Sequence, residues 1–363
     1  MARLRIGIIG TGGIARAHTN MYARFPDVAE VVAGSDIVPG RAEAFLKENN
    51  LPNALAFDST EEMLDKTKLD AVSVCTYAAT HAECAIQALE HGLPVLLEKP
   101  MCVTLDEAKA VIAAEKKSGA FVTVGFQPRY DLNLRRVKEI IDSGTLGKVY
   151  YVQTGGGRPR NIPGKLSFLT KATAGGGSCS DAGCYPIDLA MNSIGNPKPL
   201  TVSATLTTYF GNDPKCNSYF PDQFDVDDFS SAYVRLEGGI VLDYRMSWFM
   251  HMDTLGDFIF LGTKAGLKIK QHGPVGAWDG LIGSMSLFQQ DANNEKSYIP
   301  IETAIPAEPQ VDLWERKIKD FLDAVTDGNN IAPIPTNQII YNQAIIDGMM
   351  RSSALGREVE CVF

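Results

Sequence analysis

The chain lacks several features that would assign it to large classes of proteins. No stretch of about 18 or more uncharged apolar residues occurs in the 363 residues, so we expect no membrane-spanning helix. Positive charge is in deficit, since 34 lysines and arginines stand against 43 aspartates and glutamates, and the net charge of −9 disfavours a nucleic-acid partner. Internal repeats and low-complexity tracts are also absent.

Cysteine is present, but not in a pattern that builds a disulfide framework. The seven cysteines are odd in number and include no C-x-x-C pair. We therefore expect reduced thiols and a cytoplasmic location. The N-terminal sequence MARLRIGIIGTGG contains no small-residue cleavage pattern, so a secretion signal is not expected there.

Apolar runs and helical segments alternate along the first 125 residues. Runs rich in valine and isoleucine, such as LRIGIIG and PVLLEKP, are separated by helical segments such as THAECAIQALEHG. This alternation predicts βαβ units, and nearly continuous apolar runs are typical of parallel strands buried on both faces. The first 125 residues are therefore predicted to form a doubly wound parallel sheet.

The pattern changes after a predicted helix that ends at Gly144. Longer strands follow, and residues 228–248 contain a Gly-Gly turn between two of them, which is typical of an antiparallel or mixed sheet. A further helix is predicted to start at the glycines near residue 175, and two amphipathic helices are predicted near the C-terminus. We place the domain boundary near residue 125, which gives an α/β domain over 1–125 and a second domain over 126–363.

A glycine-rich turn follows the first predicted strand and opens a helix. Its pattern is G-x-G-x-x-A: Gly10 permits a tight turn, Gly12 lets the main chain approach a pyrophosphate, and Ala15 lets the helix pack on the strand. The N–H groups at the helix N-terminus are suited to bind that pyrophosphate. The residues of this turn predicted to contact the cofactor are Gly10, Thr11, Gly12, Gly13 and Ile14.

Asp36 ends the second predicted strand, 21 positions after Ala15. A carboxylate there accepts hydrogen bonds from ribose hydroxyls and repels a 2′-phosphate, so the sequence favours NAD over NADP. Arg41 weakens this preference, because a nearby arginine can bind the additional phosphate of NADP.

Three further motifs carry a resemblance to a known family. LLEKPMCVTLDEA contains Glu98-Lys99-Pro100 at the end of a predicted strand, and it is accompanied by VSVCTYAATHAECAIQALEHG and GGGSCSDAGCYPID. Together with the glycine turn, these motifs resemble the Gfo/Idh/MocA family of NAD(P)-dependent oxidoreductases over nearly the whole chain. The resemblance implies an N-terminal Rossmann domain, a C-terminal α+β domain with an open, mostly antiparallel sheet, a homodimer or homotetramer, and a sugar-like substrate.

The resemblance also implies roles for residues at matching positions. Lys99 matches the motif lysine that reaches the nicotinamide ribose and the reacting hydroxyl, and Glu98 is expected among the cofactor contacts. Asp181 matches the aspartate after the triple glycine. Tyr185 stands where many members have a histidine as the acid/base.

Thr76 and His81 are carried over from the same resemblance as cofactor contacts. The segment between them departs from the family pattern, because Tyr77 and Ala78 replace a proline and an asparagine found in many members. Any polar contact that the asparagine makes to the cofactor is therefore missing here.

Oxidation of an alcohol requires a hydride acceptor, a base for the hydroxyl proton and positive charge near the developing oxyanion. The nicotinamide supplies the acceptor. A free tyrosine titrates at about pH 10, and a neighbouring ammonium favours the phenolate. We hypothesise that Tyr185 exchanges the proton, that Lys99 polarises the hydroxyl and tunes Tyr185, and that Asp181 orients the substrate or Lys99. Whether Tyr185 or Lys99 accepts the proton stays open.

Residues 174–195, AGGGSCSDAGCYPIDLAMNSIG, combine glycines, cysteines and acidic residues. Cys179 and Cys184 are five residues apart, so they do not share a helix face, and no nearby histidine completes a metal site. The glycines are interpreted as a place where the main chain passes close to cofactor or substrate. The residues predicted to share one helix face, at spacing i, i+4 and i+7, are Asp181, Tyr185 and Asp188.

Three arginines are further candidates for substrate binding. Arg129 opens the helix after the first domain, and Arg158 and Arg160 follow a predicted strand. Each can bind a hydroxyl or a carboxylate, or can lie in a solvated loop. The aspartates of FDVDDFSS are interpreted as a strand-entry turn, and no metal is expected.

The leading hypothesis is a cytoplasmic NAD-dependent dehydrogenase of a sugar, glycoside or cyclitol, with no nucleic-acid or membrane partner. One alternative is a dehydrogenase or reductase of a non-sugar diol or a ketose. Another is a non-catalytic NAD-binding sensor, which is disfavoured because Lys99, Asp181 and Tyr185 are all present.

Overall fold

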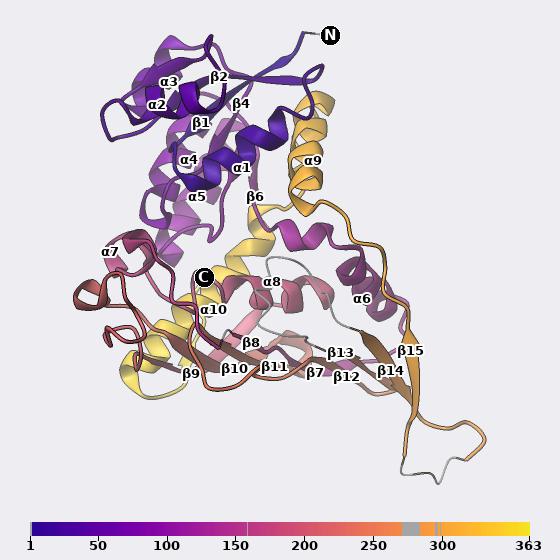
Figure 1. Cartoon of the computed structure of the whole chain (residues 1–363). Coiled ribbons are helices and arrows are strands. Elements are labelled where there is room, and N and C mark those ends of the chain that lie inside the picture. Colours follow the sequence, from indigo (N-terminus) through magenta and orange to yellow (C-terminus); the bar gives the residue numbers. More distant parts are fainter. Residues whose placement is uncertain (1, 158, 271–283, 295–296, 298) are drawn as a thin grey trace. The chain divides into compact units, whose positions relative to one another are not determined.

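The chain forms two compact units in a computed structural model that describes residues 2–157, 159–270, 284–294, 297 and 299–363 (Figure 1). Unit 1 comprises Met1–Phe126 and Asp312–Ile340. Unit 2 comprises Gln127–Val311 and Tyr341–Phe363. Arg158, one of the three candidate arginines, lies outside the described residues.

The sheet of unit 1 is parallel, as the alternating pattern predicts. Its strand order is β3-β2-β1-β4-β5-β6, and every pairing is parallel. Strands β4, β5 and β6 are buried along their whole length, which accounts for their uninterrupted apolar sequences. The strands are β1 (Leu4–Ile9), β2 (Ala29–Ser35), β3 (Leu55–Phe57), β4 (Ala71–Val74), β5 (Val95–Leu97) and β6 (Val122–Val124).

Local sequence signals set the ends of the helices in unit 1. Helix α5 begins with a capping box, in which the Thr104 side chain accepts from the N–H of Glu107 while the Glu107 side chain accepts from the N–H of Thr104. It ends at Gly119, whose φ of +73° is the left-handed conformation typical of helix ends. The helices described in this unit are α1 (Gly13–Tyr22), α2 (Arg41–Glu48), α3 (Thr60–Lys66), α4 (His81–Glu90), α5 (Leu105–Ser118) and α9 (Leu313–Asp327).

Helix α9 belongs to unit 1 although it lies far along the chain. Ile318 and Phe321 are fully buried in the core of this unit, and the Phe321 ring meets Phe121 edge-on with 6.0 Å between the ring centroids. Figure 1 shows α9 beside α1, which it contacts. The predicted boundary near residue 125 placed everything that follows in the second domain. Residues 312–340 instead lie in unit 1, because the apolar face of α9 has its partners there.

The strands described in unit 2 form one mixed sheet. Its order is β15-β14-β13-β12-β7-β11-β10-β9-β16, and most pairs are antiparallel, although β11 pairs in parallel with β7 and β8. The β10–β11 hairpin turns at Gly238 and Gly239, whose φ values of +79° and +77° confirm the predicted Gly-Gly turn. The strands are β7 (Val149–Gln153), β8 (Gly156–Gly157), β9 (Pro199–Thr207), β10 (Phe229–Leu236), β11 (Ile240–Ser247), β12 (Phe258–Gly262), β13 (Ala265–Ile269), β14 (Met285–Gln289), β15 (Ile301–Ile305) and β16 (Val359–Glu360).

The predicted start of the glycine-rich helix near residue 175 is wrong. Gly175, with φ +75°, ends the short helix α7 (Lys171–Ala174), and α8 runs over Cys184–Ser193. Asp181 therefore lies in turns before α8 and does not share a helix face with the residues of α8. The other helices described in unit 2 are α6 (Leu132–Asp142) and α10 (Thr336–Leu355), which begins in unit 1.

Two expectations from composition can be compared with the structure. All seven cysteines are free thiols, as their spacing predicts. In the part of the chain that the structure describes, no helix is both long enough and apolar enough to cross a membrane.

We predict that Phe321→Ala lowers the free energy of unfolding by about 3–5 kcal/mol, because it removes a fully buried ring from the core of unit 1. Lys319→Ala, on the exposed face of the same helix, is expected to change it by less than about 0.5 kcal/mol. Chemical unfolding followed by circular dichroism measures both. Equal losses in the two variants would contradict the placement of α9 in this core.

Candidate functional site

The turn between β1 and α1 has the geometry that the glycine pattern predicts. Gly10 has φ +83°, and a Cβ on it would lie 2.7 Å from Cγ2 of Thr76, so only glycine fits. At Gly12 a Cβ would meet nothing within 4 Å, which leaves open space in front of the main chain. The residue that precedes α1 is Gly12, and no side chain accepts a hydrogen bond from the N–H groups of the first turn as an N-cap. These N–H groups form the positive end of the helix dipole.

Asp36 holds this turn from the end of β2. Its Oδ2 accepts hydrogen bonds from the main-chain N–H and the hydroxyl of Thr11, both at 3.0 Å. Its Oδ1 accepts from the N–H of Val38 at 3.0 Å and lies 3.6 Å from the guanidinium of Arg41. The carboxylate is therefore fixed in position beside the glycine turn, with an exposed arginine next to it.

Lys99 lies two residues after the end of β5, at the same edge of the sheet as the glycine turn. Strands β1 and β5 are parallel and are separated only by β4, so their carboxyl ends meet at one edge. The peptide bond between Lys99 and Pro100 is cis. The preceding Glu98 is buried, and its Oε2 accepts from the main-chain N–H of Lys99 at 3.3 Å.

His81 joins two loops at this edge. Its Nδ1 lies 2.8 Å from the carbonyl oxygen of Pro100, and its Nε2 lies 3.2 Å from that of Thr76. Burial lowers the pKa of His81, although both carbonyls oppose this shift. The buried ring therefore connects the loop that contains Thr76 to the loop that contains Pro100. The expected direct contact of His81 and Thr76 with a cofactor stays a prediction.

In unit 2, the turns before α8 are organised by Asp227. Its side chain accepts hydrogen bonds from the N–H groups of Gly177 and Cys179, at 2.8 and 2.9 Å. These contacts hold the segment in turns, which is the physical reason that no helix starts at residue 175. A Cβ on Gly177 would lie 1.9 Å from the main-chain oxygen of Asp227, so this glycine is required by a close approach within the unit.

Tyr185 lies in the first turn of α8 and is buried. Its hydroxyl oxygen accepts a hydrogen bond from the side-chain amide of Gln127, with 3.2 Å between the two atoms. Asp181 lies in the turn that precedes the helix. Lys99 belongs to unit 1, whereas Asp181 and Tyr185 belong to unit 2, so their joint action stays a prediction.

One turn further along α8, Asp188 forms a buried ion pair with Arg129. Nε and Nη2 of Arg129 donate to the two carboxylate oxygens at 2.9 and 2.6 Å, and the side chains are 8% and 1% exposed. The side-chain amide of Asn342 donates to the same carboxylate at 2.8 Å. Arg129 is therefore not in a solvated loop, and its position supports the helix that carries Tyr185.

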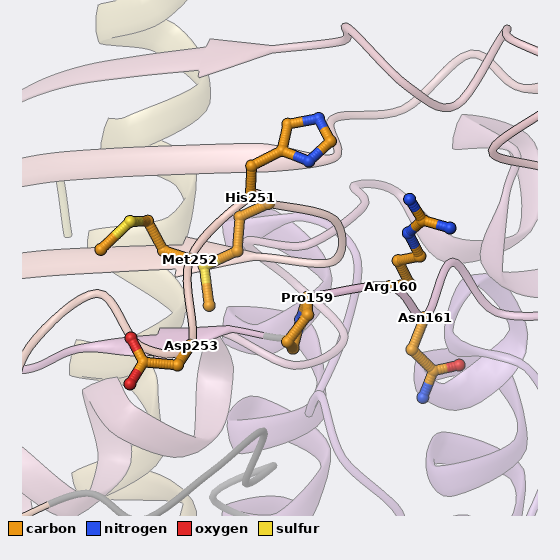
Figure 2. A pocket seen from close by; sticks show the side chains of 7 residues that line it. Pro159, Arg160, Asn161, His251, Met252 and Asp253 are labelled. Atoms are coloured by element: carbon orange, nitrogen blue, oxygen red, sulfur yellow. The ribbon is translucent and has the colours of Figure 1, made fainter.

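Arg160 lines an open cavity of about 630 Å³ in unit 2. Figure 2 shows Arg160 and Asn161 on one side of this cavity and His251 and Asp253 on the other. The Arg160 guanidinium lies 5.7 Å from the centroid of the Phe249 ring. Arg160 is exposed, and its expected role in substrate binding stays a prediction.

The acidic segment that precedes β10 is a turn, as its sequence predicts. Asp227 organises the turns before α8. Its neighbour Asp228 accepts hydrogen bonds from the main-chain N–H groups of Tyr209, Phe210 and Gly211. These carboxylates are thus occupied by main-chain donors. Over the described ranges, no group of three or more histidine, cysteine, aspartate or glutamate side chains is placed to hold a metal ion.

Comparison with known families decides what this arrangement is. Residues 4–126 match the model of an oxidoreductase family with an NAD-binding Rossmann fold, GFO_IDH_MocA. Residues 134–268 match the model of the GFO/IDH/MocA C-terminal domain. The chain belongs to the Gfo/Idh/MocA family. Unit 1 thus contains the NAD-binding domain of a Gfo/Idh/MocA oxidoreductase, and the predicted resemblance is confirmed.

Similar proteins in this family act on sugars and cyclitols. The chain is 29% identical over 272 residues to D-glucoside 3-dehydrogenase of Escherichia coli (strain K12), which covers 73% of this chain and 77% of that enzyme. It is 25% identical over 344 residues to inositol 2-dehydrogenase of Agrobacterium fabrum (strain C58), covering 84% and 98%. A solved structure of levoglucosan dehydrogenase with NADH has a TM-score of 0.79 at 21% identity, covers 99% of this chain and 100% of that one, and shows a shared fold.

The residues at the glycine turn fit NAD. To bind a pyrophosphate, the main chain must come close to the phosphate oxygens and must offer N–H donors to them. The open space at Gly12 permits the close approach, and the uncapped first turn of α1 offers the donors. When bound, NAD supplies the hydride acceptor. In this Gfo/Idh/MocA chain, Asp36 lies next to the turn, and its expected contact with ribose hydroxyls stays a prediction.

Sequence reasoning missed several polar residues that organise the site. Gln127 and Asn342 contact Tyr185 and Asp188, but single amides in the sequence carry no recognisable motif. Lys317 is different, because it interrupts the apolar face of an amphipathic helix that includes Ile318 and Phe321. A lysine at an apolar position signals a buried partner, and this signal was available in the sequence.

We predict different outcomes for alanine at the two glycines of the NAD turn. Gly10→Ala is expected to lower the free energy of unfolding by about 1–3 kcal/mol, because it strains the backbone and crowds Thr76. Gly12→Ala is expected to leave stability within about 1 kcal/mol, since space for the methyl group exists. Both are expected to weaken NAD binding by at least about tenfold, or about 1.4 kcal/mol.

Isothermal calorimetry with NAD and thermal unfolding without it measure these two effects separately. Wild-type NAD affinity in Gly12→Ala would contradict the placement of the pyrophosphate at this turn.

Proposed function

We propose that this protein is an NAD-dependent dehydrogenase that transfers a hydride from a secondary hydroxyl of a sugar, glycoside or cyclitol. The observation that carries the proposal is the position of Lys99 at the same edge of the parallel sheet as the NAD turn. An ammonium carried by a residue at this edge is suited to polarise a hydroxyl next to the cofactor. The dehydrogenases of glucosides and inositols named above support this substrate class.

Tyr185 is the residue that we propose to exchange the substrate proton. Its oxygen accepts a hydrogen bond from Gln127, and a donor to a phenol oxygen stabilises negative charge on that oxygen. The side chain is held by a helix whose next turn is fixed by the Arg129–Asp188 ion pair. Lys99 is proposed to polarise the hydroxyl and Asp181 to orient the substrate.

Arg160 is proposed to bind substrate hydroxyls from the cavity that it lines in unit 2. Arginine donates hydrogen bonds through several N–H groups in a planar arrangement that suits neighbouring oxygens.

NAD is proposed as the physiological cofactor rather than NADP, because the carboxylate of Asp36 lies beside the turn.

A homo-oligomer is also proposed, assembled through the sheet of unit 2. Side chains along β10 alternate between buried and more exposed positions, which is the pattern of a sheet with one face uncovered. Tyr233, one of the more exposed residues of β10, has 43% of its surface exposed. Such side chains are suited to burial against a second copy.

The substrate class is tested by following NADH absorbance with a panel of aldoses, inositols, alkyl and aryl glycosides, and non-sugar diols. We expect turnover with at least one glycoside or cyclitol and at least about tenfold lower kcat/KM with NADP than with NAD. Turnover restricted to non-sugar diols would replace the proposed substrate class. NAD binding without turnover on the whole panel would favour a sensor.

Tyr185→Phe is expected to reduce kcat by at least about 100-fold with the best substrate, because it removes the proton-exchanging group and keeps the ring. Tyr219→Phe, at an exposed tyrosine of the same unit, serves as the control and should retain wild-type kcat. Steady-state kinetics between pH 6 and 10 provide the measurement. Unchanged kcat of Tyr185→Phe across this range would exclude the role and point to Lys99 as the proton acceptor.

A further inference from the structure

A buried group of charged and polar side chains lies behind the Glu98-Lys99 motif in unit 1. Glu98 Oε1 accepts a hydrogen bond from the ammonium of Lys317 at 2.6 Å and lies 2.8 Å from Nε2 of His18. The side chains of Lys317, Glu98 and His18 are 1%, 5% and 0% exposed. The three residues come from different segments: Lys317 from α9, Glu98 from the position directly after β5, and His18 from α1.

Nε2 of His18 has two neighbours, the Glu98 carboxylate at 2.8 Å and the Lys317 ammonium at 3.2 Å. Because an ionised carboxylate can only accept, we assign a proton to Nε2, and in the neutral ring Nδ1 then accepts from the Ser73 hydroxyl at 3.1 Å. The Ser73 oxygen can then accept from the hydroxyl of Tyr22, at 2.7 Å. With a neutral His18, Lys317 is the cation that balances Glu98.

The charges agree with this assignment. Burial lowers the pKa of His18, and the neighbouring Lys317 ammonium lowers it further, against the effect of Glu98. Burial alone would raise the pKa of Glu98, but Lys317 and His18 outweigh it and hold that pKa well below its usual range. Cys75 is within electrostatic reach of Glu98 and Lys317, and burial raises its pKa, so it stays a neutral thiol.

The carboxylate of Glu98 is confined on its other sides. A Cβ on Gly125 would lie 2.9 Å from Oε1, so the main chain directly after β6 passes against the carboxylate. Lys317 is confined as well, because its ammonium lies 4.0 Å from the centroid of the Trp314 ring. Oε2, the second oxygen of Glu98, is turned to the N–H of Lys99.

We propose that Lys317 is a positioning residue for the reaction, which acts through Glu98 to fix the main chain of Lys99. This inference rests on the proposed role of Lys99. The ion pair holds one carboxylate oxygen, so that the other oxygen stays directed at Lys99. Among the described residues that contact this carboxylate, His18 is the other side chain that can carry a positive charge, and it balances Glu98 only when protonated.

The test compares Lys317→Met with wild type at pH 6.0 and pH 8.5, using the substrate with the highest turnover. We expect kcat to fall by about tenfold or more at pH 8.5, with the KM for NAD within about threefold of wild type, because the NAD turn is not altered. Loss of the ammonium raises the pKa of His18. Protonated His18 then replaces Lys317 at low pH, and the loss of kcat should shrink to about threefold or less at pH 6.0.

Two further variants give matched controls. Lys317→Arg keeps the charge and is expected to restore kcat to within about threefold of wild type. Lys319→Met changes an exposed lysine of the same helix and should leave kcat unchanged. Melting temperatures of all variants establish that each is folded under assay conditions.

A loss of kcat in Lys317→Met that is the same at both pH values would overturn the proposal, and so would wild-type kcat at pH 8.5. If Lys317→Met does not fold, the double variant Glu98→Gln with Lys317→Met removes both buried charges together. Its kcat is expected to be at least about fivefold below wild type at both pH values, and wild-type kcat would overturn the proposal. Absence of turnover in the wild-type protein would instead count against the proposed function.

Discussion

The buried carboxylate of Glu98 is the contact on which the arrangement of unit 1 depends. Glu98 lies directly after β5 and contacts α1 through His18 and α9 through Lys317, so that residues more than 200 positions apart meet at one oxygen, Oε1. Removing one partner of such a buried pair typically costs about 3–5 kcal/mol, because the remaining charge is left without compensation. The same carboxylate contacts the main chain of Lys99, so the core of the domain and the edge that carries its chemistry share one interaction.

Three further carboxylates hold other segments of the chain in place. Asp36 holds the NAD turn through Thr11, and Asp227 holds the turns before α8 through three consecutive residues. Asp188 holds α8 through Arg129. Each acid accepts hydrogen bonds from several donors, so that Asp36 and Asp227 hold irregular segments in place and Asp188 holds a helix.

This rigidity suits a dehydrogenase that must place a hydroxyl, a cation and a proton carrier with little freedom. Preorganised groups stabilise developing charge without reorganisation during the reaction. In unit 1 the NAD turn and Lys99 share an edge of a parallel sheet, and in unit 2 Tyr185 is fixed by Gln127. A protein that only binds NAD would not need the second set of contacts, which favours the enzyme over the sensor.

The sequence by itself determined the βαβ pattern, the NAD turn and the Glu98-Lys99-Pro100 motif, because these depend on local spacing and on residues that few conformations accept. Gly10 is an example, since its positive φ and its contact with Thr76 leave no alternative to glycine. Tertiary structure decided where α9 packs, why α8 starts at Cys184, and that Arg129 pairs with Asp188. Each of these depends on a partner far away in the chain, such as Asp227 for the glycine turns, and local periodicity contains no information about such partners.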